Sequence, residues 1–220
     1  HSPGHSGARS ARGKTEYAFN RRLTLEALDA LHAAGFTQAF HVNPKDEDLS
    51  LTTRTRRAAQ AHAEVFISLH HDSVQDRFLV TWKPDDSEQR YSDRAAGFSL
   101  FIHNGNAQAP QSRALAEDLG RRLRAQGLTP NLHHAEAIDG ERRELLEAQL
   151  GLYRFDQLAV LKTAQSPAVL LEAGVIVNRD EEVQLENARY RKSITHALVQ
   201  TVVQACERPS TPVQKATSIR

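Results

Sequence analysis

The sequence predicts a single α/β domain, built as a mostly parallel twisted sheet with helices on both faces. Apolar segments of strand length alternate along the chain with longer segments of helical periodicity, which is typical of this class. Two of the apolar segments, 64–70 and 167–174, end in ionisable residues that a core would reject. Because open α/β sheets place their sites at the carboxyl ends of strands, we expect a functional site where these two strands end.

The first part of the chain predicts a β-α-β crossover. Apolar residues at helical spacing indicate a helix over 18–34, and Gly35 is placed to end it. A strand is expected over 36–42. A helix with a serine N-cap follows over 50–63 and leads into the strand at 64–70.

The remaining elements follow the same alternation, with one exception. Residues 74–96 are polar and contain Pro84, which indicates a long loop or lid. Further on we expect strands at 97–103, 131–137 and 167–174, and helices at 111–126, 142–150 and 180–204. One folded domain is expected to span 1–206, followed by a disordered tail at 207–220 that is rich in Pro, Ser and Thr.

Composition excludes several classes of function. The 28 Lys and Arg residues balance 27 Asp and Glu residues, so nothing indicates nucleic acid or an anionic membrane as the main partner. The one cysteine, Cys206, excludes an internal disulfide and a thiolate metal cluster, and we expect it to be buried. No apolar run is long enough to span a membrane, and a mature exported protein would look the same. We expect a monomer.

The strand ending at His70 carries a possible metal ligand. Side chains alternate along a strand, so His70 and Asp72 share one face and His71 points to the other. A neutral imidazole binds zinc, and a nearby carboxylate can fix its tautomer. The alternative is a capping or core histidine. On the expected strand at 131–137, His133 and His134 would face opposite ways, so we expect them to be surface residues.

The first residues add a second part of the pattern. A glycine-rich loop, His-Ser-Pro-Gly-His-Ser-Gly-Ala from His1, leads to Glu16 at the start of a helix. With Ser-Leu-His-His-Asp at 68–72 and Pro-Ala-Val-Leu-Leu-Glu-Ala-Gly at 167–174, the sequence resembles the zinc-dependent N-acetylmuramoyl-L-alanine amidases of the cell-wall type, the amidase_3 family. The resemblance covers nearly the whole chain.

The resemblance implies one Zn²⁺ ion held by His1, Glu16 and His70. His5 is an alternative to His1 because it follows a glycine, as the family pattern asks, but its spacing to Glu16 is too short. The family also has an apolar strand and an Asp-x-Gly before this histidine. Two expectations therefore stay open, namely an upstream segment absent from this sequence or a first strand that has been cut away.

The resemblance also implies that Glu172 is the catalytic acid/base. Its alternative role is a helix N-cap or a buried ion pair. Asn178, in the segment after Glu172, is expected to shape a loop, and Arg54 is expected to form a structural salt bridge.

The implied reaction is zinc-dependent hydrolysis of the amide between N-acetylmuramic acid and the L-alanine of the peptidoglycan stem peptide. The partners would be peptidoglycan or muropeptides, and the location periplasmic or extracellular. Two alternatives remain: a zinc carboxypeptidase or other metallo-amidase acting on free peptides, and a catalytically inactive cell-wall-binding module.

Some relatives carry a helix that covers the zinc until a partner protein removes it. Here a helix within 74–96 could start only near Ser87 and would have about two turns, a length that is marginal alone. We therefore expect an accessible zinc and an enzyme active without a partner, with Phe78, Trp82 and Lys83 forming a lid wall beside the substrate. The alternative is an inert surface loop.

Overall fold

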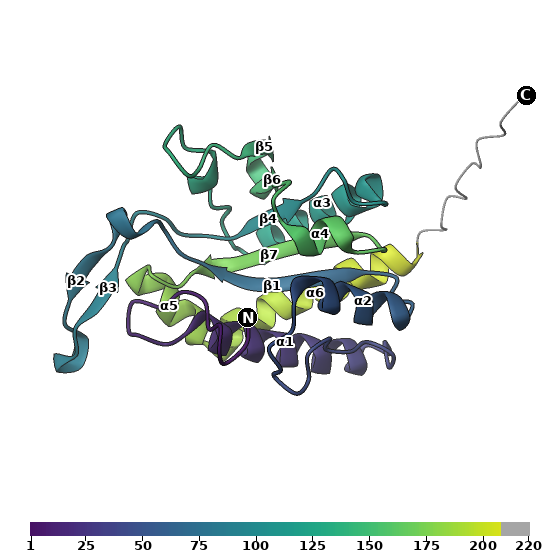
Figure 1. The fold of residues 1–220 in the computed structure, drawn as a ribbon, viewed down its shortest axis with the longest axis horizontal. Coiled ribbons are helices and arrows are strands. Elements are labelled where there is room, and N and C mark those ends of the chain that lie inside the picture. Colours follow the sequence, from purple (N-terminus) through teal and green to yellow (C-terminus); the bar gives the residue numbers. More distant parts are fainter. Residues whose placement is uncertain (208–220) are drawn as a thin grey trace, which may run out of the picture.

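The computed structural model describes residues 1–207, and the rest of the expected tail, 208–220, lies outside the described residues. A five-stranded sheet has the order β1-β7-β4-β6-β5, and β2 and β3 form a separate hairpin (Figure 1). The strands are β1 Phe66–Asp72, β2 Val80–Trp82, β3 Gln89–Tyr91, β4 Ser99–Ile102, β5 Glu144–Glu147, β6 Leu152–Arg154 and β7 Ala168–Val175. The helices are α1 Glu16–Ala33, α2 Leu51–Gln60, α3 Ala109–Ala125, α4 Ala159–Thr163, α5 Arg179–Glu186 and α6 Ala188–Glu207.

The sheet is mixed, whereas the sequence predicted a mostly parallel one. β1 pairs with β7 and β4 with β6 in parallel, but β4 runs antiparallel to β7 and β5 antiparallel to β6. The chain reaches β4 through the β2–β3 hairpin rather than through a crossover helix, so nothing requires a parallel return. β5 and β6 are joined by a single short turn, which only an antiparallel pair allows.

Helices cover both faces of the sheet, as predicted. On one face, α1, α3 and α6 pack Phe19, Leu119 and Ile194 against the sheet residues Leu100 and Leu171. On the other face, α2 and α4 pack a smaller cluster that consists of Ala58, Phe66, Phe101, Tyr153, Val160, Leu161, Ala164, Ala168 and Leu170. None of the described helices is long and apolar enough to cross a membrane.

The first two helices end and begin where the sequence indicated. Gly35 has φ +95°, and the N–H of Phe36 donates to the carbonyl of Leu31, which is the hydrogen bond of a Schellman helix end. Ser50 caps α2, because its hydroxyl accepts from the N–H of Thr53 at 3.2 Å.

Four predicted elements are wrong. Residues 36–42 form turns instead of a strand, and 131–137 contain only the 3-10 turn His133–Ala135. Residues 142–150 contain the strand β5 rather than a helix, because Gly151, at φ 54°, folds this segment back onto β6. The helix expected over 180–204 is interrupted at Asn187, whose side chain accepts from the N–H of Arg189 at 2.8 Å and starts α6.

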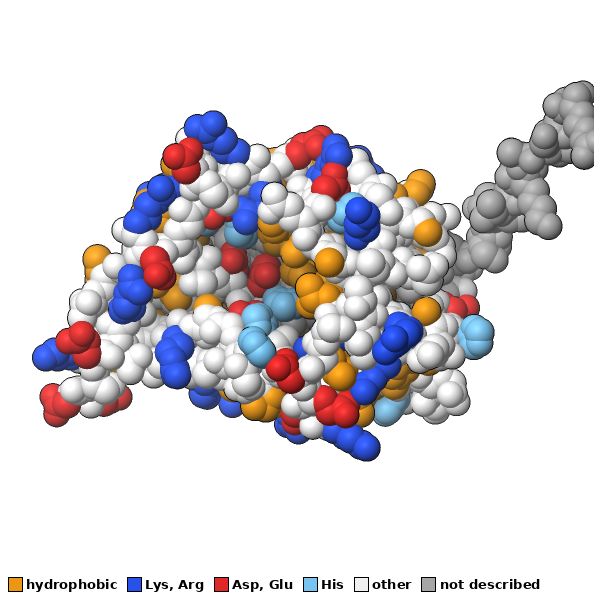
Figure 2. Space-filling model, viewed as in Figure 1, with side chains coloured by type: hydrophobic (Ala, Val, Ile, Leu, Met, Phe, Trp, Pro, Cys, Tyr) orange, Lys and Arg blue, Asp and Glu red, His pale blue; other side chains and the backbone are white. Residues whose placement is uncertain are grey.

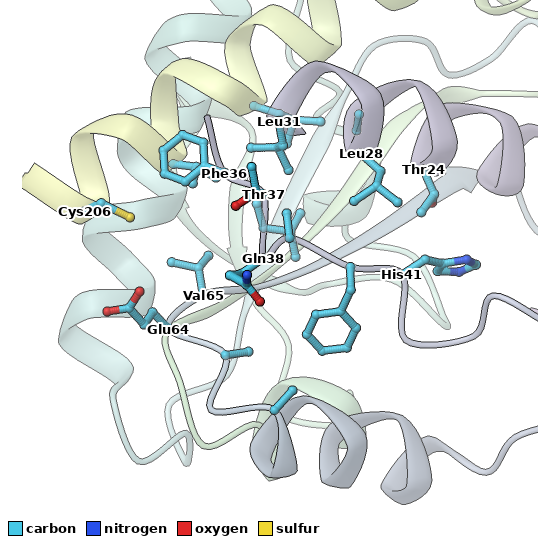
Figure 3. A pocket seen from close by; sticks show the side chains of 18 of the residues that line it. Thr24, Leu28, Leu31, Phe36, Thr37, Gln38, His41, Glu64, Val65 and Cys206 are labelled. Atoms are coloured by element: carbon cyan, nitrogen blue, oxygen red, sulfur yellow. The ribbon is translucent and has the colours of Figure 1, made fainter. Parts of the chain in front are cut away.

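Because 36–42 is not a strand, the outer edge of β1 has no neighbouring strand among residues 1–207. A pocket of about 450 Å³ lies beside this edge (Figure 3). Leu28, Leu31, Phe36 and Val65 line it, together with Cys206 at its far end. Cys206 is exposed, not buried as expected, because the last turn of α6 extends beyond the core.

Residues 74–96 form the β2–β3 hairpin, which projects from one end of the molecule (Figure 1). No helix starts near Ser87. The indole N–H of Trp82 donates to the carbonyl of Ala11 at 2.7 Å, and the guanidinium of Arg12 lies 5.3 Å from the ring centroid of Trp82. The hairpin is therefore fixed to the N-terminal loop.

The other two residues expected in a lid wall lie elsewhere. Phe78 packs edge-on against His133, with 6.2 Å between the ring centroids. Lys83 is exposed to solvent. The three side chains therefore do not form one common wall.

Candidate active site

The carboxyl ends of β1 and β7 lie side by side, and His70 is the direct partner of Glu172 across this parallel pair. Phe66 and Leu170, which precede them on the same face, are covered by α2 and α4. The face is open beyond these helices. Figure 2 shows histidine and acidic side chains gathered in a hollow of this open part.

His1, Glu16 and His70 meet in this region, although they come from a loop, a helix and a strand. The distance from His1 Nε2 to Glu16 Oε2 is 2.9 Å, and that from His70 Nδ1 to Glu16 Oε1 is 3.0 Å. One donor atom from each residue lies within 4.8 Å of the other two. The Glu16 side chain is 8% exposed, whereas those of His1 and His70 are 27% and 23% exposed, so the group is reached from the histidine side.

The donor chemistry of this group fits a zinc ion. The Nδ1 of His1 lies 3.0 Å from the carbonyl of His5, to which its N–H donates, and this turns Nε2 towards Glu16, the side on which a metal would bind. Burial acts to raise the pKa of Glu16, but the hydrogen bonds from His1 and His70 outweigh it and hold that pKa well below its ordinary value. Two imidazoles and one carboxylate form a three-ligand set that leaves a position open for water.

His5 is not part of this group. Its Nδ1 lies 2.9 Å from Asp48 Oδ1, and its side chain is 75% exposed. Of the two histidines that the sequence left open, the structure brings only His1 to Glu16 and His70.

Two further residues hold Glu16 in place. The amide of Asn20, one turn along α1, donates to Glu16 Oε1 at 3.0 Å. The Nδ1–H of His71 in turn donates to Asn20 Oδ1 at 2.7 Å, and burial lowers the pKa of His71 to about 3, so its ring is neutral. The sequence analysis did not single out Asn20, although its position four residues after Glu16 on one helix indicated that the two side chains could be neighbours. The strand alternation, which turns His71 away from His70, likewise indicated that His71 has a different partner.

Gly7 leaves the space that Glu16 and His1 occupy. A Cβ atom at Gly7 would lie 2.3 Å from Glu16 Oε2 and 2.8 Å from His1 Cε1, and the backbone has φ +72°. Gly4, in the same loop, has no atom within 4 Å of such a Cβ and no positive φ. The loop therefore tolerates a side chain at Gly4 but not at Gly7.

We expect Gly7→Ala to lose most of its bound zinc and Gly4→Ala to retain it, because only the first substitution displaces two proposed ligands. Elemental analysis after zinc reconstitution measures the difference, and circular dichroism verifies that both variants are folded. Equal zinc content in the two variants would contradict this assignment of the loop.

Glu172 is partly exposed, but its Oε2 atom is buried and has no hydrogen-bond partner among residues 1–207. Burial raises its pKa well above the ordinary value, and the negative charges of Asp72 and Glu16 add to this effect. A carboxyl group with a raised pKa, beside a candidate metal group, is suited to take up and return a proton.

Asp72 does not support His70 as expected. The strand is irregular between the two residues, and Asp72 Oδ2 instead accepts from His134 Nε2 at 2.8 Å and from the amide of Asn131 at 3.3 Å. Between the pairs His70–Glu172 and Asp72–Val175 the extra residue lies on β7, and Asp72 is held by Asn131 and His134 rather than by His70.

His133 and His134 are buried, at 3% and 5% exposure, and not on the surface as expected. The reason is charge pairing, since each ring nitrogen of His134 faces a carboxylate, Asp72 at 2.8 Å and Glu141 at 2.9 Å. His133 Nδ1 lies 2.9 Å from Glu136. The sequence prediction was wrong because it did not take these carboxylates into account. Two of them, Glu136 and Glu141, follow the histidines within eight residues.

Burial acts to lower the pKa of His134, but its bonds to Asp72 and Glu141 outweigh burial and raise it to about 9. Because this value exceeds the unfolded value of about 6.5, His134 stabilises the fold fully below pH 6.5 and loses this effect as the pH rises through about 9. We expect the free energy of unfolding of wild type to exceed that of His134→Gln at pH 6.5, and the difference to shrink by roughly 2–3 kcal/mol by pH 10. Denaturant titrations of both proteins measure it, and a pH-independent difference would show that His134 is not charged.

The two remaining candidates have structural contacts. Asn178 Oδ1 accepts from the N–H groups of Asp180 and Glu181 and so caps α5. The guanidinium of Arg54 donates to the carbonyl of His1 at 3.2 Å rather than to a carboxylate, so its contact steadies the terminal loop.

Three comparisons place the chain among known proteins. A family model described as N-acetylmuramoyl-L-alanine amidase matches residues 1–204. The search of curated proteins returned no match.

Solved structures of low sequence identity share the fold. The N-acetylmuramoyl-L-alanine amidase AmiC2 of Nostoc punctiforme superposes with a TM-score of 0.67 at 20% identity, covering 94% of this chain and 93% of that one. The catalytic domain of the amidase CwlV from Bacillus (Paenibacillus) polymyxa gives 0.66 at 21% identity, with 94% and 93% coverage. An N-acetylmuramoyl-L-alanine amidase of Clostridium difficile 630 gives 0.69 at 17% identity, with 94% and 92% coverage.

Proposed function

This chain belongs to the N-acetylmuramoyl-L-alanine amidase family, and on this premise we propose that it is a zinc hydrolase with His1, Glu16 and His70 as metal ligands and Glu172 as the catalytic acid/base. Its reaction is hydrolysis of the amide between N-acetylmuramic acid and the L-alanine of the stem peptide. The observation that carries the residue assignment is the meeting of the three donor groups beside Glu172, at the ends of two paired strands.

Each side chain has a separate task in this mechanism. A bound zinc ion would supply Lewis-acid activation of water and of the scissile carbonyl. Glu172 takes the proton of the attacking water on its carboxylate and delivers a proton to the nitrogen of the leaving amine. Asn20 and Ala8 keep Glu16 oriented, through bonds of 3.0 and 3.3 Å to its two oxygens.

Peptidoglycan or its muropeptide fragments are the proposed substrates, in the periplasm or outside the cell, and the protein is proposed to act as a monomer. The exposure of His1 and His70 supports a site that needs no partner to open it. Residues 74–96 contain no α-helix.

The family match favours an amidase over a carboxypeptidase. Such an enzyme needs a cation for the terminal carboxylate of its substrate. Arg143 is the arginine whose positive charge acts to lower the pKa of Glu172. Its guanidinium is already ion-paired with Glu141 and lies 4.4 Å from the ring centroid of Phe155. An inactive wall-binding module would have no use for Glu172 beside the three donor groups.

Incubation of the zinc-loaded protein with purified muropeptides, followed by mass spectrometry of the products, tests the proposal. We expect a peptide with a free L-alanine amino group and a muramic acid with a free lactyl carboxylate. Release of single residues from the peptide end would indicate a carboxypeptidase. Binding without cleavage would indicate a wall-binding module.

A further inference from the structure

Two residues paired across the sheet at the candidate active site each have a buried polar atom without a partner among residues 1–207. One is Oε2 of Glu172 on β7, and the other is the hydroxyl of Ser99 at the start of β4. Ser99 is 0% exposed. Buried polar groups in native proteins are nearly always hydrogen-bonded, so two such atoms on paired residues call for a common explanation.

The register of the sheet places these two side chains on the same face. Ser99 and Glu172 are direct partners in the antiparallel pair of β4 and β7. Opposite residues in such a pair point the same way, with Cβ atoms about 4.5–5.5 Å apart. The next pair along, Leu100 and Leu171, points into the opposite core, as this alternation requires.

His70 continues the same row, because it is the partner of Glu172 on the other side. Across three neighbouring strands the open face therefore carries His70, Glu172 and Ser99 in line. Glu172 has a proposed metal ligand on one side and a hydroxyl on the other.

We propose that Ser99 is a positioning residue for Glu172, with its hydroxyl donating a hydrogen bond to Oε2. A serine hydroxyl turns about a single bond and a glutamate carboxylate about three, so the two can meet without a backbone shift. This bond would satisfy both buried atoms. It would also leave Oε1, which is not among the buried atoms without a partner, to exchange protons with water and the leaving amine. The inference rests on the proposed function of Glu172.

The test compares Ser99→Ala with a matched control, Thr201→Val. Thr201 lies in α6, which packs on the opposite face of the sheet from Glu172, is 1% exposed, and its hydroxyl also has no partner among residues 1–207. Both variants lose one buried hydroxyl. We expect Ser99→Ala to lower kcat about tenfold with KM, zinc content and Tm nearly unchanged, because a hydrogen bond to a charged group is lost. Thr201→Val should leave kcat unchanged.

A double-mutant cycle assigns the effect to Glu172. In a Glu172→Gln background, Ser99→Ala should produce no further loss of activity, because the group it positions is gone. Ser99→Thr, which keeps the hydroxyl, should restore most of kcat. Wild-type kcat in Ser99→Ala, or an equal loss in both backgrounds, would overturn the proposal.

A measurement without substrate separates this inference from the proposed function. The ¹³C resonance of the Glu172 carboxyl carbon can be assigned by its absence in Glu172→Gln. We expect Ser99→Ala to shift it and Thr201→Val not to. An unshifted resonance would overturn the role of Ser99 even if the protein hydrolyses muropeptides, and a shifted one would support it even if it does not.

Discussion

Glu172→Gln is expected to lower amide hydrolysis by at least about 10²–10⁴-fold while the protein binds zinc normally, since general acid/base groups typically contribute this much. Glutamine keeps the shape of the side chain but cannot take up a proton at the carboxylate. Rates with muropeptides, measured together with zinc content, give the result. A variant within a few-fold of wild type would move Glu172 to a structural role.

Glu181→Gln is the matched control for this substitution. Glu181 is also a buried glutamate, at 6% exposure, and burial raises its pKa to about 7. Its carboxylate, however, accepts hydrogen bonds from the N–H groups of Gly97 and Val175 and supports the fold. We expect Glu181→Gln to change stability more than kcat. This result would show that a raised pKa by itself does not account for the loss of activity in Glu172→Gln.

His1→Ala is expected to lose zinc and, with it, activity, because it removes one of three proposed ligands and leaves Glu16 with a single histidine. His5→Ala is the control, since it removes an imidazole only four residues away that pairs with Asp48 on the surface. Elemental analysis after zinc reconstitution should find about one zinc per chain in His5→Ala and nearly none in His1→Ala. The reverse result would show that His5 is the ligand.

Much of the candidate site could be predicted from short motifs, because each motif combines a local structure with a chemical group. An apolar run that ends in His70, and another that ends in Glu172, indicate strand ends whatever the rest of the fold is. Glu16 follows a glycine-rich loop at a helix start, which is also a local signal. The parallel pairing that makes His70 and Glu172 neighbours was not readable from either segment alone.

The supporting residues were harder to predict, because they act through partners far away in the sequence. His134 is buried since it lies between Asp72 and Glu141, and without Asp72, 62 residues earlier, it resembles a surface histidine. Asp72 itself was assigned to His70 by simple alternation, but its carboxylate accepts from Asn131 and His134, which lie 59 and 62 residues further along the chain. Ser99 gave no signal at all in the sequence.

The sequence by itself determined the α/β class, the capped helices α1 and α2, and the residue types from which a metal site can be built. These depend on periodicity, caps and motifs, all of which act within one turn or one strand. Only the tertiary structure decided between His1 and His5 as neighbours of Glu16, the mixed direction of the strands, and the row of His70, Glu172 and Ser99. These depend on register and on which strands become neighbours, and hydrogen bonds between segments about 70–100 residues apart fix both.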